Sequence, residues 1–327
     1  MQQFADFAPN LLKVFLTSLL CTVVLGPIII PILNKLRLGQ YIRQDGPAKH
    51  FKKAGTPTMG GIIFIIPLLI ATMIFAGDSV EALTAATVTL GYGIIGFMDD
   101  FIKIALKRPL GLKARYKLLG QVILGLLLTI YAVQYLGRGT GLNVPFTGAA
   151  VDLGSLYYPF VLLVLVGSTN AVNITDGLDG LAAGCTMFVS AGYVFISLMA
   201  GKPELAVFAA ALAGGCFGFL AFNFYPAKVF MGDTGSLALG AAVACLSVLT
   251  GTELVLPIIG GIYVIETLSV VLQVASFRLR GKRIFLMSPL HHHFELAGWD
   301  EEKIVLMFWA FSVFFALMGV LSALKIG

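Results

Sequence analysis

The sequence predicts an all-α polytopic membrane protein in which residues 1–327 form a single integral-membrane domain. Hydrophobic residues make up 58% of the chain and charged residues only 12%, about half of the roughly 25% typical of a soluble domain. Apolar stretches run close to 20 residues, the length an α-helix needs to cross about 30 Å of hydrocarbon. A soluble fold of this size would lack the polar surface to cover them. The lipid bilayer is therefore the expected surrounding of most of the surface.

Ten stretches are long enough to be spans, and an even number predicts that both termini lie on one side of the membrane. The first is predicted to be a retained helix, because no basic segment precedes it and it is too long for the core of a cleaved signal peptide. The ten predicted spans cover residues 11–33, 58–76, 81–98, 117–137, 156–172, 181–200, 204–223, 235–250, 255–275 and 304–325.

The basic residues predict the orientation. Three connections carry six, six and five Lys and Arg residues, and Lys228 brings their face to 18 of the 22 in the chain. Positive charge is retained in the cytoplasm, so this face is predicted to be cytoplasmic and both termini external. A reporter fused after Gly327 should be external, and a cytoplasmic reporter would contradict this topology. The net charge of +5 is thus explained by topology, and no nucleic-acid partner is expected.

Two local irregularities are expected. The external connection at about 137–155 is rich in Gly and Thr with alternating segments, which predicts a short β-hairpin. Within the ninth span, Pro257 and the pair Gly260-Gly261 predict a bent or broken helix. Glu266 in the same span is expected to face protein or water instead of lipid.

Five aspartates lie at the predicted cytoplasmic boundary: Asp99 and Asp100 end the third span, Asp176 and Asp179 follow the fifth, and Asp233 precedes the eighth. Ionisable groups at membrane depth are costly and usually functional. A single Asp beside Gly and Thr can instead cap a helix, but two adjacent aspartates repel unless a cation lies between them. Carboxylates from several helices suit Mg²⁺, which also binds substrate phosphates. The sequence therefore predicts an active site with Mg²⁺ on the cytoplasmic face.

The segments around these aspartates favour phosphate binding. TDGLDG and GDTGS are Gly-rich turns that lead into helices, whose N-termini attract anions, and neither matches a P-loop. The basic residues nearby can neutralise a diphosphate and a lipid phosphate, although anchoring of the cytoplasmic face explains most of them as well. These residues are Lys53, Lys103, Lys107, Arg115 and Lys117.

His291, His292 and His293 are three of the four histidines of the chain. Consecutive histidines in a loop reach a single zinc ion poorly. Phosphate binding or an acid–base role is the preferred interpretation, and a structural role is the alternative.

Five segments together resemble the polyprenyl-phosphate N-acetylhexosamine-1-phosphate transferases: KKAGTPTMGG, GFMDD, NAVNITDGLDGLA, NFYPAKVFMGDTGS and SPLHHHFELAGW. The superfamily shares the aspartate segments, whereas the histidine run and KAGTPTMGG resemble its phospho-N-acetylmuramoyl-pentapeptide transferase branch. The resemblance implies a bacterial inner-membrane enzyme of peptidoglycan synthesis. Its implied reaction converts UDP-N-acetylmuramoyl-pentapeptide (UDP-MurNAc-pentapeptide) and undecaprenyl phosphate into lipid I and UMP, with Mg²⁺. A homodimer is also implied.

The resemblance assigns roles to single residues. Asp233 is implied as the Mg²⁺ ligand, Asp99 and Asp100 as essential at the metal–phosphate centre, and His291 as catalytic. Phe230 is expected to stack on uracil. The implied substrate-binding residues are Lys53, Thr58, Lys103, Lys107, Lys117, Asn170, Asn173, Asp176, Asp179, Asn223, Phe230, His292 and His293.

Two mechanisms stay open at this point. In one, Asp99 takes the proton from the lipid phosphate, which attacks the donor directly; in the other, an Asp carboxylate attacks first and forms an acyl phosphate. The first is preferred because a phosphate monoester is already an anion. The rival functions are a sister transferase that uses UDP-N-acetylglucosamine, which the histidine run disfavours, and a secondary transporter, which the one-sided acids disfavour.

Overall fold

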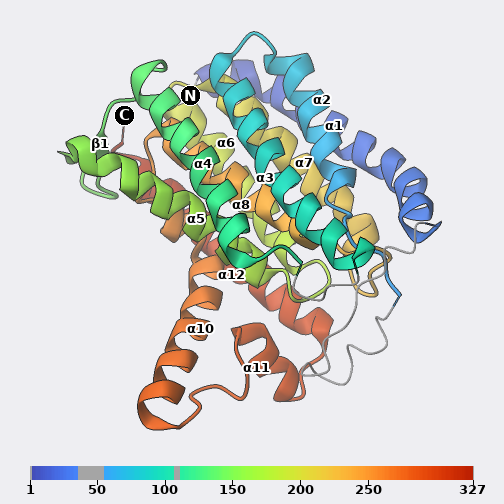
Figure 1. The fold of residues 1–327 in the computed structure, drawn as a ribbon. Coiled ribbons are helices and arrows are strands. Elements are labelled where there is room, and N and C mark those ends of the chain that lie inside the picture. The colour runs from blue at the N-terminus through green and yellow to red at the C-terminus, as the bar shows by residue number, and fades with distance from the viewer. Residues whose placement is uncertain (1, 36–54, 107–110, 327) are drawn as a thin grey trace.

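The computed structural model describes residues 2–35, 55–106 and 111–326, and it is a bundle of helices with one small sheet (Figure 1). Within these residues, nine helices are long and apolar enough to cross a membrane, which confirms the predicted class of fold. The elements are α1 (Gln2–Lys35), α2 (Ile62–Ala76), α3 (Val80–Ala105), α4 (Ala114–Gln134), β1 (Gly141–Asn143), β2 (Ala150–Asp152), η2 (Gly154–Leu156), α5 (Tyr157–Thr175), α6 (Leu181–Met199), α7 (Pro203–Asn223), α8 (Gly232–Thr250), α9 (Leu256–Ile259), α10 (Gly261–Arg280), α11 (Leu290–Leu296) and α12 (Glu301–Ala323).

The second predicted span, 58–76, is shorter than expected. Its helix α2 has 15 residues and covers about 22 Å at 1.5 Å per residue. The residues before it pair with another segment instead: Gly60 N–H donates to the Phe230 carbonyl at 2.9 Å, and Phe230 N–H donates to the Pro57 carbonyl at 2.8 Å. Backbone pairing thus replaces the first helical turn and anchors this segment just before α8.

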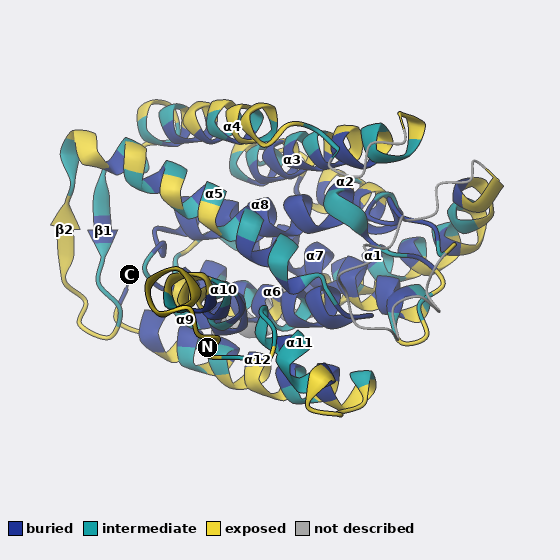
Figure 2. Cartoon of the chain, turned by 60° about the horizontal axis from the view of Figure 1, so that its bottom comes forward, coloured by how far each residue is buried: buried dark blue, intermediate teal, exposed yellow. Residues whose placement is uncertain are grey.

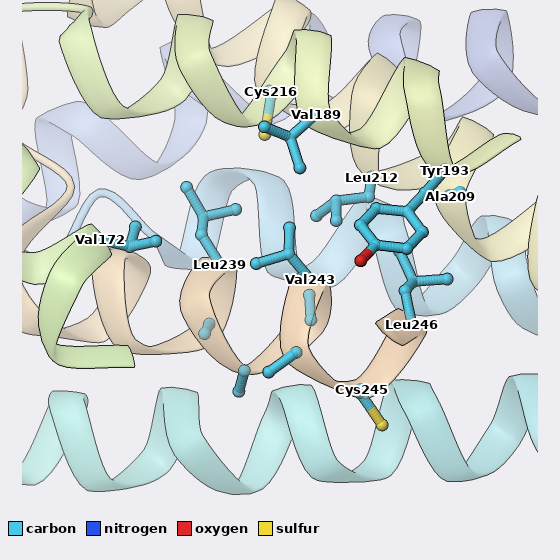
Figure 3. Packing of buried hydrophobic residues seen from close by; sticks show 14 of the residues in the cluster. Val172, Val189, Tyr193, Ala209, Leu212, Cys216, Leu239, Val243, Cys245 and Leu246 are labelled. Carbon is cyan, nitrogen blue, oxygen red and sulfur yellow. The ribbon is translucent and has the colours of Figure 1, made fainter. Parts of the chain in front are cut away.

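Helices α7 and α8 form the centre of the bundle. In their apolar stretches 83% and 89% of the residues are buried, and Figure 2 shows both inside a ring of more exposed helices. Val243 and Leu246 of α8 pack toward Tyr193 of α6 and Leu212 of α7 (Figure 3). Helices that are apolar all round belong in such a position. Because α8 lies at the centre, residues at its start are contacted by neighbouring helices on several sides.

α3 and α8 approach so closely that their backbones touch. A Cβ atom on Gly96 of α3 would lie 2.0 Å from the carbonyl oxygen of Asp233 at the start of α8. Small residues permit such contacts between membrane helices. Because the last turns of α3 lie beside the first turn of α8, side chains from both helices meet there.

The two predicted irregularities are confirmed. β1 and β2 form an antiparallel hairpin in which Leu142 pairs with Val151. The ninth span is broken at Gly260 between α9 and α10, and α10 then points away from the bundle (Figure 1). Pro257 lies in the first turn of α9, where its missing N–H costs no hydrogen bond, so the break belongs to the glycine. Glu266 in α10 faces protein and is fully buried.

The chain ends lie toward the same end of the bundle, the end of the hairpin, with α11 at the other (Figure 1). Within the described chain this agrees with the prediction that the termini share a side. The side of the membrane to which this end corresponds stays a prediction.

A buried ion pair holds the hairpin end together. Arg138 Nη2 donates to both carboxylate oxygens of Glu253, at 2.7 and 2.8 Å. The remaining donors of Arg138 reach the carbonyls of Val248 and Gly141, and the Tyr157 hydroxyl donates to Glu253. The guanidinium thus ties α8, the hairpin and α5 to the segment before α9.

Glu253→Gln should destabilise the protein without changing the first turn of α8, which lies at the opposite end of that helix. Removing one charge of a buried pair leaves the other uncompensated, which costs about 3 kcal/mol. We expect a thermal midpoint in detergent that is several degrees lower. Asp300→Asn is the matched control, because Asp300 pairs with Lys303 in an exposed position and should leave the midpoint unchanged. An unaltered midpoint for Glu253→Gln would show that the pair does not stabilise the fold.

Candidate active site

Three aspartates meet where α3 lies beside the start of α8. One carboxylate oxygen from each of Asp99, Asp100 and Asp233 lies within 4.8 Å of the others. Asp99 and Asp100 do not end their helix as predicted, because α3 continues to Ala105. The extra turn places Lys103 on the same helix face as the two aspartates, at the spacings that bring side chains together.

Lysines neutralise much of this carboxylate cluster. Lys103 Nζ lies 2.6 Å from Asp99 Oδ2, 3.0 Å from Asp233 Oδ2 and 3.5 Å from Asp100 Oδ1. Lys117 Nζ from α4 lies 2.6 Å from Asp233 Oδ2. One ammonium group thus contacts all three carboxylates, and two positive charges oppose three negative ones.

The two neighbouring aspartates have different surroundings. Asp100 Oδ2 accepts hydrogen bonds from the N–H and hydroxyl of Thr234 at 2.9 and 2.8 Å, and Oδ1 accepts the N–H of Asp233 at 3.2 Å. Asp100 therefore caps α8 from a different helix, where an anion is favoured. Asp99 accepts one N–H, from Leu112 at 2.8 Å, and contacts Lys103. Among the described residues, Asp99 thus accepts fewer backbone N–H and hydroxyl groups than Asp100.

The two predicted asparagines of α5 occupy separate places. Asn173 Nδ2 donates to Asp233 Oδ1 at 2.8 Å and to Ser236 Oγ at 2.7 Å, so it joins the carboxylate cluster. Asn170, one turn earlier, donates to Gln121 Oε1 at 3.1 Å and to the carbonyl of Val166. The structure brings Asn173 but not Asn170 to the aspartates.

The TDGLDG turn lies against the same cluster. Burial, together with the negative charges of Asp233, Asp100 and Asp179, raises the pKa of Asp176 well above its usual value. Asp179 Oδ2 accepts the N–H of Ala227 at 2.9 Å. Asp176 therefore shares the electrostatic environment of the cluster, while Asp179 fastens the turn to the segment before α8.

Asn223, Thr58 and Phe230 border this region. Asn223 accepts the N–H of Gly180 at 3.1 Å and donates to the carbonyl of Val229 at 3.0 Å, so both ends of its buried amide bind backbone. Thr58 Oγ1 and Asp100 Oδ2 both lie within 2.5 Å of the position that a Cβ on Gly232 would take. Phe230 is half-buried and pairs through its backbone with the Thr58 segment. Their predicted contacts with substrate stay predictions.

The three histidines point in different directions. His291 is fully buried, with Nδ1 at 3.1 Å from Glu266 Oε2. His292 Nδ1 lies 2.6 Å from Glu295 Oε2, and His293 Nδ1 accepts the N–H of Leu286 at 3.2 Å. The contacts described give each ring a separate protein partner.

Known proteins match this chain along nearly its whole length. The model of glycosyl transferase family 4 matches residues 82–251, which include the three clustered aspartates, and a phospho-N-acetylmuramoyl-pentapeptide-transferase signature matches residues 53–65. Curated proteins named phospho-N-acetylmuramoyl-pentapeptide-transferase include those of Desulfitobacterium hafniense and Moorella thermoacetica. Each is 55% identical, covering 95% and 94% of this chain and 97% of the relative. The chain belongs to this family of transferases.

The donor set of the transferase fits a divalent cation. Carboxylate oxygens from two helices converge, and a positive group, Lys103 Nζ, already lies among them. Hard oxygen ligands of this kind suit Mg²⁺, with Asp99, Asp100 and Asp233 as the residues that would hold it. Two predicted lysines, Lys53 and Lys107, lie outside the described residues of the transferase.

Two residues of the site and one pairing were missed by the sequence interpretation. Thr234 and Ser236 hold Asp100 and Asn173, and both belong to the GDTGS segment that was selected only for its glycines and aspartate. Glu266 was expected to face protein or water, but its partner His291 lies 25 residues away and no spacing rule pairs them. The available sequence signal for Thr234 and Ser236 was a hydroxyl group one or three residues after Asp233.

Proposed function

We propose that this transferase moves the phospho-N-acetylmuramoyl-pentapeptide group from UDP-MurNAc-pentapeptide to undecaprenyl phosphate, which yields lipid I and UMP. The observation that carries the proposal is the carboxylate cluster with Lys103 and Lys117 at one end of membrane-length helices. The proposed donor is a soluble anion and the acceptor is an anionic lipid. They can meet only where charged groups lie at the boundary of the bilayer, and the charged composition of the cluster supports this proposal.

Magnesium is the proposed cofactor of the cluster. Mg²⁺ held by Asp99, Asp100 and Asp233 would neutralise the oxygens of the diphosphate. Lys117 and Asn173 each hold one oxygen of Asp233, so the orientation of this carboxylate is fixed from both sides. Asp100 is fixed by its bonds to the first turn of α8. The protein thereby holds its ligands in place before any substrate binds.

We favour direct transfer over a covalent intermediate. A phosphate oxygen of the lipid forms a bond to the β-phosphorus of the donor, and the bond from that phosphorus to the bridging oxygen breaks. The electron pair leaves with UMP. Asp99 is the proposed acceptor for the proton of the lipid phosphate, because three donors of α8 engage both oxygens of Asp100, whereas among the described residues Asp99 accepts one backbone N–H and pairs with Lys103. A phosphosugar trapped on Asp99 or Asp100 in a single turnover would contradict this order.

The proposed location is the bacterial plasma membrane, with the site on its cytoplasmic face. The distribution of Lys and Arg supports this orientation, as does the soluble nature of the proposed donor. Both termini would then be external. The homodimer that the resemblance implies is part of the same proposal.

The proposed function is tested with the purified full-length protein in detergent and undecaprenyl phosphate. UMP release is measured with UDP-MurNAc-pentapeptide and, as the control donor, UDP-N-acetylglucosamine. We expect release with the first donor only, and its loss when EDTA removes the divalent cation. Release with the control donor alone would favour the sister transferase, and release that persists in EDTA would remove Mg²⁺ from the proposal.

A further inference from the structure

Glu266 is a buried acidic residue that the proposed transfer does not use. It lies in α10 with no exposed surface, in a helix whose other side chains are largely apolar. Both of its carboxylate oxygens face the start of α11: Oε1 lies 3.2 Å from the backbone nitrogen of His291, and Oε2 lies 3.1 Å from its Nδ1. A carboxylate at this depth is costly unless it has such a partner. The two contacts join α10 to the histidine run.

These contacts determine which ring nitrogen of His291 carries the proton. The backbone N–H can only donate, so it occupies Oε1 of the carboxylate. An ionised Oε2 can only accept, so Nδ1 must donate, and in a neutral imidazole this leaves Nε2 with a free lone pair. Glu266 thus fixes both the orientation of the ring and its tautomer.

Nε2 of His291 points toward the TDGLDG turn. It is buried and has no hydrogen-bond partner among the described residues. A Cβ atom on Gly177 would lie 2.2 Å from it, so only a glycine allows the ring to approach this closely. Buried polar atoms in folded proteins nearly always have a partner. A molecule bound at this turn would supply the missing donor for Nε2.

The turn relates His291 to the carboxylate cluster. Asn173 near the end of α5 donates to Asp233 Oδ1 at 2.8 Å, and Gly177, four residues later, faces His291. A donor with its diphosphate at the cluster would thus bring the adjoining part of the molecule to Nε2. That part of a nucleotide sugar carries hydroxyl and amide groups, which donate hydrogen bonds.

We propose that Glu266 is a positioning residue of the transferase: it holds His291 so that Nε2 accepts a hydrogen bond from a hydroxyl or amide group of the donor beside its diphosphate. The inference rests on the proposed function. His291 contacts the donor, and Glu266 acts only through His291. The pair thus contributes to recognition of the donor and not to the bond changes at phosphorus.

Glu266→Gln tests this directly, because glutamine keeps the size and both contacts. The backbone N–H of His291 again requires the carbonyl oxygen, so the amide group of Gln must face Nδ1. Nδ1 then becomes the acceptor and the proton moves to Nε2, which can no longer accept. We expect a KM for the donor about 10- to 100-fold higher, with kcat within about threefold of wild type.

Nitrogen NMR of ¹⁵N-histidine-labelled protein gives a second readout that does not depend on activity. The chain has only four histidines, so few imidazole signals are present. We expect one neutral ring with a protonated Nδ1 in the wild type, assigned by its loss in His291→Gln, and the opposite tautomer in Glu266→Gln. A wild-type His291 with the proton on Nε2 would overturn the proposal.

Two further variants separate positioning from a structural effect. Glu253→Gln makes the same change at a buried glutamate near the hairpin end of the bundle and should lower stability while leaving KM unchanged. His291→Gln places an amide in the region of Nε2 whatever Glu266 does, so adding Glu266→Gln should not raise KM further. Additive effects, or an unchanged KM in Glu266→Gln of an active enzyme, would overturn the proposal. A wild type that releases no UMP would instead refute the proposed function, while the NMR signals would still decide whether Glu266 fixes the tautomer.

Discussion

Asp233→Asn should lower Mg²⁺-dependent UMP release by at least about 10³-fold, the largest effect we expect from any single substitution. Asparagine keeps the shape of the side chain and can still accept from Asn173. It removes the negative charge that faces Lys103 and Lys117 at 3.0 and 2.6 Å. A neutral oxygen is a weak ligand for a hard cation. The measurement is initial rate against Mg²⁺ concentration.

Asp152→Asn is the matched control for this substitution. Asp152 is exposed in the hairpin, where it accepts from Thr140 and Gly154. It lies at the opposite end of the bundle from the cluster, so the variant should keep full activity. If Asp233→Asn kept more than a tenth of the wild-type rate at any Mg²⁺ concentration, Asp233 would not be a metal ligand.

Gly96→Ala should impair both folding and catalysis, although Gly96 has no chemical function. The added methyl would lie 2.0 Å from the backbone oxygen of Asp233, so α3 and α8 must separate. Overpacking of this kind costs about 1–3 kcal/mol. The separation also moves Asp233 away from Asp99 and Asp100, and a displacement of about 1 Å can cost on the order of 10²-fold in rate. The thermal midpoint and kcat of the same preparation measure the two effects.

Gly167→Ala serves as the control, because a Cβ atom on this glycine of α5 meets nothing within 4 Å. A helix-interior alanine in open space is neutral or favourable by up to about 1 kcal/mol. The variant should therefore match or exceed the wild type in midpoint and retain its rate. If both alanine variants had the same thermal midpoint and kcat, the contact between α3 and α8 would tolerate a methyl group on Gly96.

Most of the architecture could be predicted from the sequence because it follows from local patterns. Apolar length predicted the spans, and Pro257 with the Gly-Gly pair predicted a bent or broken ninth span, which the structure breaks at Gly260. The predictions failed where one segment is held by a distant one. Residues 58–61 were included in the second predicted span, but this segment pairs through its backbone with the segment before α8. α3 was expected to end at its aspartates, but it continues for another turn, with Lys103 contacting all three carboxylates.

The same division applies to the aspartates of the candidate site. Their number, their place near the ends of the predicted spans, and the neighbouring glycines could be taken from the sequence, and they were enough to predict a site for phosphate and a cation. Only the tertiary structure distinguishes Asp100, whose oxygens cap α8, from Asp99, which keeps fewer protein contacts. It alone pairs Glu266 with His291. The physical reason is that composition and periodicity record which residues a helix carries, whereas the direction of each side chain depends on how helices from distant parts of the chain are packed and rotated against one another.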